Sequence, residues 1–487
     1  MCEFEMKFSF INPGPSGAWE HVVTAPASWP PLGLLYIATL LKQENFGVSV
    51  LDIANQVSPK DVLKWVEREG PEILGFSTLS SSGRSAAIIA EKVKERYPDI
   101  KIAFGNYHAT FNAPKILDKY PFVDLIVRNE AEFTCLEIAD RLERGKGFGD
   151  VGGITFREGD RIVSTPDRPL IKDIDGLPFP DRGLLKDEYT STLAGLEVAT
   201  KRFTTVVSSR GCPFNCTYCA CSLFARRTWR PRSPENIVEE LEMLYSQGFR
   251  QIVFVDDNFA LNQKRVIDIC RQMKENRIDM EWVCDARVDC ISMEALRAMA
   301  KTGCKIIYYG MESANQRILD FYNKGITPSQ SRAAAKAARR AGIDIIVGSF
   351  IVGAPDETRE EIENTFDFSQ KIDIDVPLFH PLEIHPGTPL WANLSSQGYL
   401  DEDMYWERGV YASEICPKAV PLGEIYPMIY NASKKFLLRP EYLTSGFMRM
   451  LKSRYKLNIV SKNLGKLISR KFSLSEAIEI PESYRKK

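Results

Sequence analysis

Short apolar strands alternate with amphipathic helices along most of this chain, and this alternation constrains its fold more than any other feature. In the first part, strands are expected at 7–12, 48–52, 73–77 and 101–105, and helices at 30–43, 59–69 and 84–97. Parallel strands need crossover helices of this kind, which cover both faces of the sheet. Residues 1–145 are therefore predicted to form a doubly wound, Rossmann-like α/β domain.

The alternation is interrupted once and then resumes. Residues 146–200 are rich in turn residues and are interpreted as a hairpin at 153–164 followed by a linker. Strands are then expected at 204–208, 251–255, 281–285, 305–310, 345–352 and 378–384, and helices at 234–247, 263–276, 293–302, 328–341 and 358–371. This pattern predicts a partial (β/α)6 TIM-like barrel over 201–392, with its active site at the C-terminal ends of the strands. Residues 393–487 are predicted to be helical and become basic.

Charge and hydropathy exclude several classes of protein. The chain has 63 Lys and Arg against 64 Asp and Glu, so its net charge of −1 gives no reason to expect nucleic-acid binding. No apolar run approaches the roughly 18–20 residues that a membrane-spanning helix needs. Acidic residues stand near the N-terminus where a signal peptide would be positively charged. A cytoplasmic protein is expected, in which the eleven cysteines do not serve as disulfides.

Three cysteines, Cys212, Cys216 and Cys219, crowd into a C-x3-C-x2-C loop directly after a predicted strand. An iron–sulfur cube that only carries electrons takes four thiolates. Three thiolates leave one iron open, and a catalytic metal needs such an open position to hold a substrate. The alternatives are a zinc site, with Cys221 as a fourth ligand, and a set of reactive thiols without metal. The spacing favours the iron–sulfur cluster.

This loop, with the aromatic Tyr218 before its third cysteine, resembles the signature of radical S-adenosylmethionine (SAM) enzymes. Further segments similar to that family's strand ends follow in order over about 190 residues. They are 254–259, 287–289, 309–313, 350–358 and 385–390. The resemblance implies that the three cysteines bind a [4Fe-4S] cluster whose open iron chelates SAM. One electron then cleaves SAM to a 5′-deoxyadenosyl radical, which abstracts hydrogen from an unactivated carbon.

The same resemblance implies a set of SAM contacts at the strand ends. These residues are Tyr218, Asp256, Arg287, Glu312, Ser313, Gly353 and Ala354. Arg287 suits the carboxylate of SAM, and Glu312 and Ser313 suit its amino group or ribose. Gly353 and Ala354 are small enough for the backbone to approach the adenine. A solvated ion pair is the competing explanation for Arg287 and Glu312, and no catalytic acid or base is assigned.

The amino-terminal part resembles the corrinoid-binding half of cobalamin-dependent radical SAM enzymes. The similar segments are 30–36, 75–77, 105–110 and 177–180. A doubly wound sheet binds ligands at the C-terminal ends of its strands, where hydroxyl and amide groups can contact cobalamin. The residues expected to do so are Ser77, Thr78, Ser80, Ser81, Gly105, Asn106, His108 and Glu130.

Three departures from the corrinoid pattern affect this interpretation. Asn106 stands where the family has glycine, and 129–132 reads Asn-Glu-Ala-Glu instead of Gly-Glu-Gly-Glu, which restricts the backbone near a ligand. The Asp-x-His-x-x-Gly motif that supplies a cobalt-binding histidine elsewhere is absent. Cobalamin is therefore expected in its base-off form, and His108 is interpreted as a pocket or core residue.

The C-terminal region combines basic and apolar residues. Between 432 and 472 there are eleven Lys or Arg and one acidic residue. A basic amphipathic helix can lie on an anionic membrane surface, which would place peripheral membrane contact here. The alternative is a helical face packed against the barrel, with its charges in solvent. Membrane contact would make a lipid or isoprenoid-like substrate the first to test.

The functional hypothesis is a radical SAM enzyme that modifies an unactivated carbon of a small-molecule or lipid substrate by cobalamin-dependent methyl transfer. An external electron donor of the flavodoxin or ferredoxin type is implied by the resemblance. Radical C–C bond formation or cyclisation without methyl transfer is an alternative. A non-catalytic iron–sulfur and corrinoid sensor is an alternative from another class.

Overall fold

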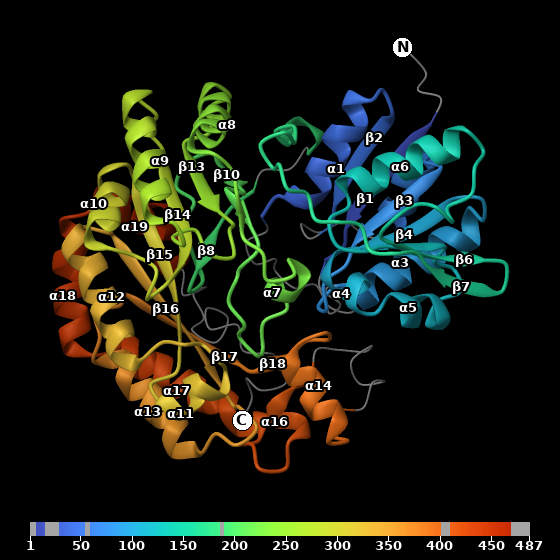
Figure 1. Ribbon diagram of the computed structural model, residues 1–487. Coiled ribbons are helices and arrows are strands. Elements are labelled where there is room, and N and C mark those ends of the chain that lie inside the picture. Colours follow the sequence, from blue (N-terminus) through green and yellow to red (C-terminus); the bar gives the residue numbers. More distant parts are fainter. Residues whose placement is uncertain (1–5, 15–28, 54–58, 186–188, 401–409, 469–487) are drawn as a thin grey trace.

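The computed structural model describes residues 6–14, 29–53, 59–185, 189–400 and 410–468. Two α/β bodies lie side by side, and helices from the C-terminal region flank the larger one (Figure 1). The first body carries a seven-stranded sheet and the second a six-stranded sheet. Both sheets confirm the fold class predicted from the sequence.

The first sheet has the strand order β2-β1-β3-β4-β5-β6-β7. Its strands are β1 (Lys7–Asn12), β2 (Gly47–Asp52), β3 (Ile73–Ser77), β4 (Lys101–Gly105), β5 (Leu125–Val127), β6 (Ile154–Glu158) and β7 (Arg161–Ser164). The first five strands are parallel, whereas β6 and β7 form the predicted hairpin and extend this sheet in the antiparallel sense.

Helices cover both faces of this sheet. They are α1 (Leu32–Gln43), α2 (Pro59–Glu69), α3 (Gly83–Arg96), α4 (Asn106–Phe111), α5 (Ala113–Lys119) and α6 (Glu132–Glu143). One core lies under α1 and α6, and the other lies under α2, α3 and α5. Strand β1 pairs with both β2 and β3, so the chain order reverses there. Ligands of doubly wound sheets bind in the crevice at such a reversal.

The second sheet has the order β10-β13-β14-β15-β16-β17, with every neighbouring pair parallel. Its strands are β10 (Phe203–Val206), β13 (Gln251–Phe254), β14 (Glu281–Arg287), β15 (Cys304–Glu312), β16 (Ile345–Val352) and β17 (Val376–Pro381). The outer helices are α8 (Pro234–Ser246), α9 (Gln263–Glu275), α10 (Met293–Lys301), α11 (Gln316–Phe321), α12 (Pro328–Ala341) and α13 (Arg359–Gln370). The predicted partial barrel is therefore present.

Local sequence explains why these helices begin where they do. Five of them follow a residue whose side chain accepts a hydrogen bond from a backbone N–H of the first turn. These residues are Ser233, Asn262, Ser292, Thr327 and Thr358. Thr327 and Thr358 form complete capping boxes with Gln330 and Glu361. Four of these caps follow a strand and Thr327 follows α11, so these turns present residues at the barrel mouth.

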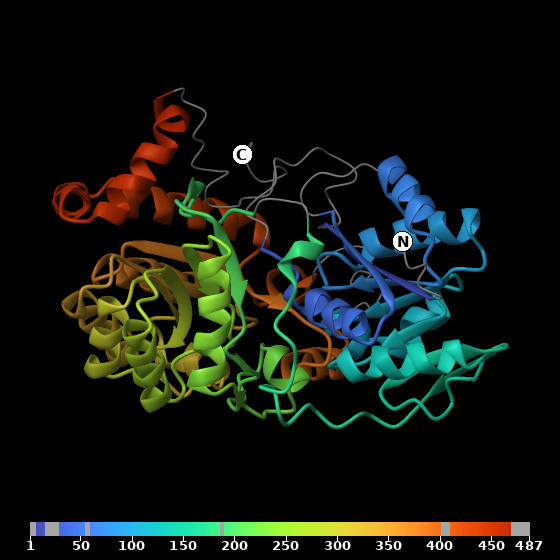
Figure 2. The same cartoon turned by 90° about the horizontal axis from the view of Figure 1, so that it is seen from above.

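The C-terminal region forms α17 (Leu422–Leu437), α18 (Pro440–Leu451) and α19 (Arg454–Ile468). Figure 2 shows α18 and α19 on the side of the barrel away from the first sheet. Tyr455 and Ile459 of α19 are buried against residues near the starts of the barrel strands, so α19 packs at the N-terminal end of the barrel. None of the described helices is both long and apolar enough to cross a membrane.

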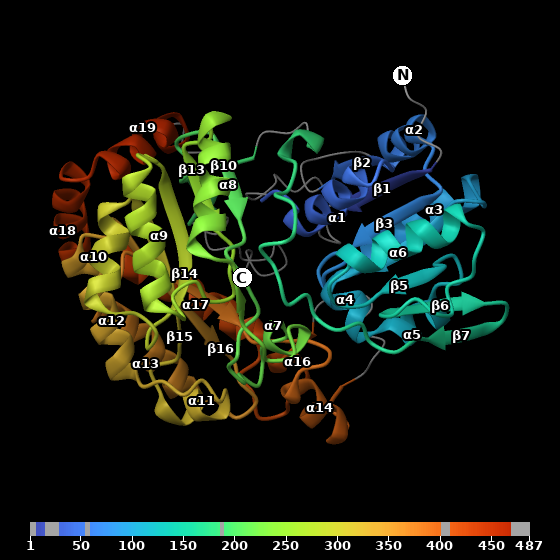
Figure 3. The same ribbon diagram turned by 45° about the horizontal axis from the view of Figure 1, so that its top comes forward.

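Short elements complete the barrel's two ends. Three are antiparallel strand pairs: β8 (Thr192–Leu193) with β9 (Leu196–Glu197), β11 (Ser209–Arg210) with β12 (Arg230–Pro231), and β18 (Glu383–Ile384) with β19 (Val410–Tyr411). The others are the helices α7 (Cys221–Phe224), α14 (Pro389–Ser396) and α16 (Ala412–Ile415). Helix α7 lies between the barrel and α4 of the first body (Figure 3).

Candidate functional site

The three-cysteine loop lies between β11 and α7, at the mouth of the barrel on the side of the first body (Figure 3). Gly211 opens the loop with a φ of +82°, and a Cβ there would lie under 3.0 Å from the carbonyl oxygen of Thr228. The N–H of Thr217 donates to the carbonyl of Tyr322 at 2.9 Å. Backbone contacts thus hold the loop against the barrel wall.

The thiols of this loop differ in environment. Burial raises the pKa of Cys212 to about 11 and also raises the pKa of Cys216. The pKa of Cys219 falls to about 7, chiefly because the Cys221 thiol donates a hydrogen bond to it and also because backbone N–H groups at the start of α7 point at it. Cys221 is therefore a partner of Cys219 in this arrangement.

The donor set suits an iron–sulfur cube. Among the described residues, no three His, Cys, Asp or Glu side chains form a group that could hold a single metal ion. A cube binds one thiolate at each of several separate irons, so its ligands need not converge on one point. Three thiols on one loop at the barrel mouth meet that requirement.

Arg287 and Glu312 both reach the cluster loop, and they do not pair with each other. Arg287 forms an ion pair with Asp289 at 3.0 Å, and its Nη1 lies 3.9 Å from the sulfur of Cys216. Glu312 accepts hydrogen bonds from Lys324 at 2.6 Å and from the hydroxyl of Tyr218 at 3.0 Å. Both side chains are buried, so a solvated ion pair does not describe them.

Glu312 also has an unusual backbone. Its φ is +59°, in the left-handed region that few residues other than glycine adopt. The register between β15 and β16 shifts between Gly310 and Glu312, which turns the carboxylate toward Lys324. Strain of this kind persists where the surrounding structure holds it, and it is frequent at functional sites.

The carboxylate of Asp256 is hydrogen-bonded to two serines of the protein. It accepts hydrogen bonds from the N–H and the hydroxyl of Ser208 at 2.7 and 2.5 Å, and from the hydroxyl of Ser209 at 2.6 Å. The neighbouring Asp257 is exposed; its carboxylate accepts a hydrogen bond from the N–H of Gly211 and lies against the Cys221 side chain. The structure therefore brings Asp257, and not Asp256, against the cluster loop.

The other residues expected to contact SAM lie at the strand ends with their polar groups engaged. The N–H groups of Gly353 and Ala354 donate to Glu357 at 2.6 and 3.1 Å. Burial raises the pKa of Glu357 to about 7 although these N–H groups act to lower it. The hydroxyl of Ser313 is buried and lies 3.2 Å from that of Thr365. A ligand at these positions has to exchange or share these hydrogen bonds.

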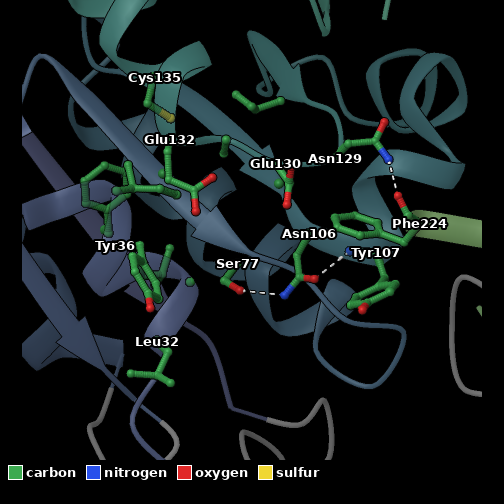
Figure 4. Close-up of a pocket in the computed structure, with 18 of the residues that line it drawn as sticks. Leu32, Tyr36, Ser77, Asn106, Tyr107, Asn129, Glu130, Glu132, Cys135 and Phe224 are labelled. Carbon is green, nitrogen blue, oxygen red and sulfur yellow. Dashed lines mark hydrogen bonds between the residues drawn. The ribbon is translucent and has the colours of Figure 1, made fainter. Parts of the chain in front are cut away.

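A cavity of about 290 Å³ lies at the C-terminal edge of the first sheet (Figure 4), and Gly211, at the start of the three-cysteine loop, is part of its lining. Its deep part is apolar and includes Phe10, Phe76 and Leu125, whereas its mouth is polar. Four of the residues expected to bind cobalamin line it, namely Ser77, Gly105, Asn106 and Glu130. Tyr36, Tyr107, Glu132 and Phe224 also face this space.

Two asparagines that stand where the related pattern has glycine have a left-handed backbone. Asn106 has a φ of +78° and Asn129 a φ of +60°. Asparagine tolerates this region better than other side chains. The amide of Asn106 donates to the hydroxyl of Ser77 at 3.0 Å, and that of Asn129 donates to the carbonyl of Phe224 at 2.9 Å. Asn106 and Asn129 therefore add polar contacts at these two turns.

The acidic turn after β5 joins the two bodies. Glu130 pairs with Arg210 at 3.1 Å and with Arg230 at 2.7 Å, and Glu132 pairs with Arg210 at 2.5 Å. Burial acts to raise the pKa of Glu130, but Arg230 and Arg210 outweigh it and hold that pKa below its usual value. These ion pairs fix the first sheet against β11 and β12, which flank the cluster loop.

The remaining residues expected at the cobalamin site do not line this cavity. His108 is buried on α4 beside Gly83, where a Cβ would come within 2.8 Å of its ring. Burial lowers the pKa of His108 to about 4. Thr78 is buried and its hydroxyl donates to the carbonyl of Gly105 at 2.8 Å. Ser80 and Ser81 lie in the turn before α3.

Several residues of the site were not singled out from the sequence. Lys324 follows α11 and carries no local signal, because only the fold brings it to Glu312. Tyr107 stacks on Phe224 with ring centroids 4.3 Å apart, which joins α4 to α7. The sequence could have pointed to Asp285 as a residue on the same face of its strand as Arg287. It lies two residues before Arg287, and side chains two apart on a strand share a face.

Two protein families match the chain. The Radical SAM superfamily matches residues 206–369, which cover the cluster loop and most of the barrel strands. The B12 binding domain family matches residues 21–139, which include most of the first sheet and of the cavity lining. Each match therefore falls on one of the two bodies that form the site.

Individual proteins are similar over most of their length. An uncharacterized methyltransferase of Pyrococcus horikoshii is 35% identical over 442 residues, 90% of this chain and 94% of that protein. The anaerobic magnesium-protoporphyrin IX monomethyl ester cyclase of Rubrivivax gelatinosus is 27% identical over 481 residues, 96% of this chain and 84% of that protein.

A solved structure shares the fold. The radical S-adenosylmethionine methyltransferase TsrM from Kitasatospora setae, with cobalamin and a [4Fe-4S] cluster bound, superposes with a TM-score of 0.67 at 17% identity. The match covers 80% of this chain and 78% of that one. It therefore extends over both bodies.

Proposed function

This chain belongs to the radical SAM superfamily, in the group with a B12-binding domain, and from this premise we propose which residues hold its cofactors and what it modifies. It is a cobalamin-dependent radical SAM enzyme of the methyltransferase type, with a [4Fe-4S] cluster, SAM and cobalamin as cofactors. When bound, the cluster supplies the electron that cleaves SAM, and cobalamin carries the methyl group.

The proposed reaction is methyl transfer to an unactivated carbon of a small organic substrate. The observation that carries this proposal is the position of the cavity, whose lining includes Gly211 at the start of the three-cysteine loop. Phe224 lines the cavity and ends the helix that follows Cys219, and it stacks on Tyr107 of the first body. A substrate between the two bodies can therefore reach both cofactors.

Cys212, Cys216 and Cys219 are assigned as the cluster ligands. Arg287 and Lys324 are the cations nearest to Cys216 on the barrel side, and they suit the carboxylate of SAM. Glu312 is the carboxylate beside them and suits the ammonium group. Glu312 and Lys324 form an ion pair with each other. When SAM binds, its ammonium can pair with Glu312 and its carboxylate with Lys324, so no buried charge is left unpaired.

Cobalamin is assigned to the cavity of Figure 4. The apolar depth suits the nucleotide base, and the polar mouth, with Ser77 and Asn106, suits the amide groups of the corrin rim. His108 lies away from this cavity, packed beside Gly83, which supports the base-off form expected from the missing motif. Its low pKa reflects burial and not a cobalt contact.

Cyclisation is the second candidate, because the chain is similar to the Rubrivivax cyclase over 96% of its length. Product analysis distinguishes the candidates. After reduction with SAM and substrate, methyl transfer gives 5′-deoxyadenosine together with S-adenosylhomocysteine, whereas cyclisation gives 5′-deoxyadenosine alone. A sensor gives neither product.

The cluster assignment is tested by replacing Cys212, Cys216 and Cys219 together by alanine. Iron at this site and 5′-deoxyadenosine formation are expected to disappear, because a cube cannot be held without its thiolates. Cys270→Ala is the matched control, since Cys270 is buried on α9 away from the loop. A triple variant that still cleaves SAM would show that the assignment is wrong.

Peripheral membrane contact through α18 and α19 is proposed as a separate property. It is supported by apolar side chains that are exposed on this region, namely Leu438, Met448, Leu451, Leu457 and Leu464. Several basic side chains, however, bind carboxylates or carbonyls of the protein itself. They are Lys435, Arg439, Arg449, Lys456, Lys462 and Lys466. Arg470 and Lys471 lie outside the described residues.

The position of α19 means that membrane contact there would not indicate a lipid substrate. Tyr455 packs at the N-terminal end of the barrel, whereas the cluster loop is at the C-terminal end. A membrane on α18 and α19 would therefore not face the mouth of the site. The lipid or isoprenoid-like substrate stays a proposal that this surface does not support. The external electron donor, of the flavodoxin or ferredoxin type, likewise stays a proposal.

A further inference from the structure

A carboxylate projects into the interior of the barrel. Asp285 lies on β14 in the middle of the six-stranded sheet, and its side chain is exposed. The neighbours Cys284 and Ala286 point to the outer face, where they pack in the core beneath α9 and α10. Side chains alternate along a strand, so Asp285 points inward. The space to which it is exposed is the interior of the barrel.

On the side of β15, β16 and β17, the described inward-facing residues level with Asp285 carry no second charge. In the strand register, Asp285 is beside Tyr308 on β15, and the row continues through Val347 and Val376. Val253 and Val283, one layer lower, belong to the apolar cluster that α19 closes from below. An ionisable group in such surroundings is costly unless a ligand compensates it.

Other carboxylates at this end of the barrel have partners, and Asp285 does not. Asp256 is held by two serines, Asp289 by Arg287, and Glu312 by Lys324. Among the described residues, only repulsive neighbours act on Asp285, and no hydrogen bond or ion pair reaches its carboxylate. Desolvation inside the barrel, followed by the charges of Asp256 and Asp257, raises the pKa of Asp285 to about 7 although its carboxylate is exposed to the barrel interior. The carboxylate is therefore available to a ligand.

We propose that Asp285 binds a hydrogen-bond donor of the substrate, an ammonium or hydroxyl group, and so positions the carbon that is modified. The proposal rests on the proposed function and names the class of substrate that this site accepts. A purely hydrocarbon group would leave the carboxylate unpaired inside the barrel, whereas an ammonium or hydroxyl group satisfies it. The substrate therefore carries a polar group close to its reacting carbon.

The position of Asp285 distinguishes it from the residues assigned to SAM. Arg287 ends the same strand and reaches the sulfur of Cys216. Asp285 is two residues earlier, which is about 6.6 Å deeper along the strand. The group that it binds therefore lies below the level of the cluster loop, inside the barrel.

Small deuterated probes test this assignment in the holoenzyme. Hexylamine, hexanol and methyl pentyl ether, each deuterated on carbon, have similar length, and only the ether lacks a hydrogen-bond donor. Each is incubated with the reduced enzyme and SAM, and deuterium in 5′-deoxyadenosine is measured by mass spectrometry. Deuterium transfer from the amine or the alcohol is expected to exceed transfer from the ether by about tenfold, the size of one hydrogen bond to a charged group.

Two variants separate binding by Asp285 from a structural effect. Asp285→Asn keeps the shape but removes the charge, so transfer from the amine is expected to fall more than transfer from the alcohol. Asp285→Leu keeps the branched shape at Cγ and has no acceptor, and it is expected to reverse the preference in favour of the ether. A folding defect lowers all three signals together and cannot reverse their order.

The outcomes distinguish the inference from the function on which it rests. Absence of 5′-deoxyadenosine from the wild-type enzyme overturns the proposed function. Normal SAM cleavage with equal labelling from the three probes, with no labelling, or with an unchanged order in Asp285→Leu overturns the role of Asp285 alone. A large loss of SAM affinity in Asp285→Asn would assign the carboxylate to SAM and would also overturn it.

Discussion

Gly211→Ala tests whether the backbone at the start of the cluster loop is required for cofactor binding. Gly211 has a φ of +82°, and the left-handed region costs a residue with a Cβ about 1–2 kcal/mol. The added Cβ would lie 2.5 Å from the Cβ of Ala225 and still closer to the carbonyl oxygen of Thr228. A backbone oxygen cannot rotate away, so overpacking adds about 1–3 kcal/mol.

These two costs together amount to about 2–5 kcal/mol. If the loop avoids them by leaving its position, the population with Cys212, Cys216 and Cys219 in place falls roughly 30-fold or more. We expect iron and labile sulfide per folded protein to fall after anaerobic reconstitution, together with 5′-deoxyadenosine formation. The circular dichroism of the folded state is expected to persist, because both α/β cores lie elsewhere.

Two alanine variants provide matched controls. Gly145 has a φ of +62° with nothing within 4 Å of the added Cβ, so Gly145→Ala reports the conformational cost alone. Gly303 has a φ of +99° and a Cβ there would lie under 3.0 Å from the carbonyl oxygen of Met280, so Gly303→Ala reports a similar clash away from the loop. Gly303→Ala should lower stability and keep its iron. Wild-type iron content and SAM cleavage in Gly211→Ala would refute the reasoning.

Three further predictions concern other parts of the molecule. Gly33→Leu should fill open space beside the cavity and lower the cobalt content per protein after cobalamin loading. The same change should raise the stability of helix α1 by about 1 kcal/mol, because glycine is a poor helix former. An unchanged cobalt content would contradict the assignment of cobalamin to this cavity. His108 has a pKa of about 4 in the folded state, below its unfolded value of 6.5, so stability is lost as the pH falls through this window. Between pH 7 and pH 5 the loss is about 2 kcal/mol, and His108→Gln should abolish that part of the slope in urea unfolding. If α18 and α19 bind membranes, replacing the exposed Leu457 and Leu464 by serine should reduce the fraction of protein that sediments with anionic vesicles. Added salt should reduce this fraction for both the wild type and the variant. Equal sedimentation with neutral vesicles would exclude an electrostatic contribution to binding.

The order of elements in this protein followed from local patterns. The strand at 73–77 and the helix at 328–341 lie within a residue of their expected bounds, because an apolar period and a capping residue act over a few neighbours. The spacing of Cys212, Cys216 and Cys219 likewise lies within a single loop. Such features need no knowledge of distant residues, and they were sufficient for the fold class and the cluster loop.

Contacts between distant segments were decided only by the tertiary structure. Glu312 pairs with Lys324 next to a shift in strand register, Asp256 accepts hydrogen bonds from the serines that follow β10, and His108 packs against Gly83. Asp285 shows the limit of a local pattern: the strand period predicts its face, but only the folded barrel shows that no other described residue pairs with its carboxylate. Sequence patterns place a side chain on an element, whereas its partners depend on how the sheets and loops pack together.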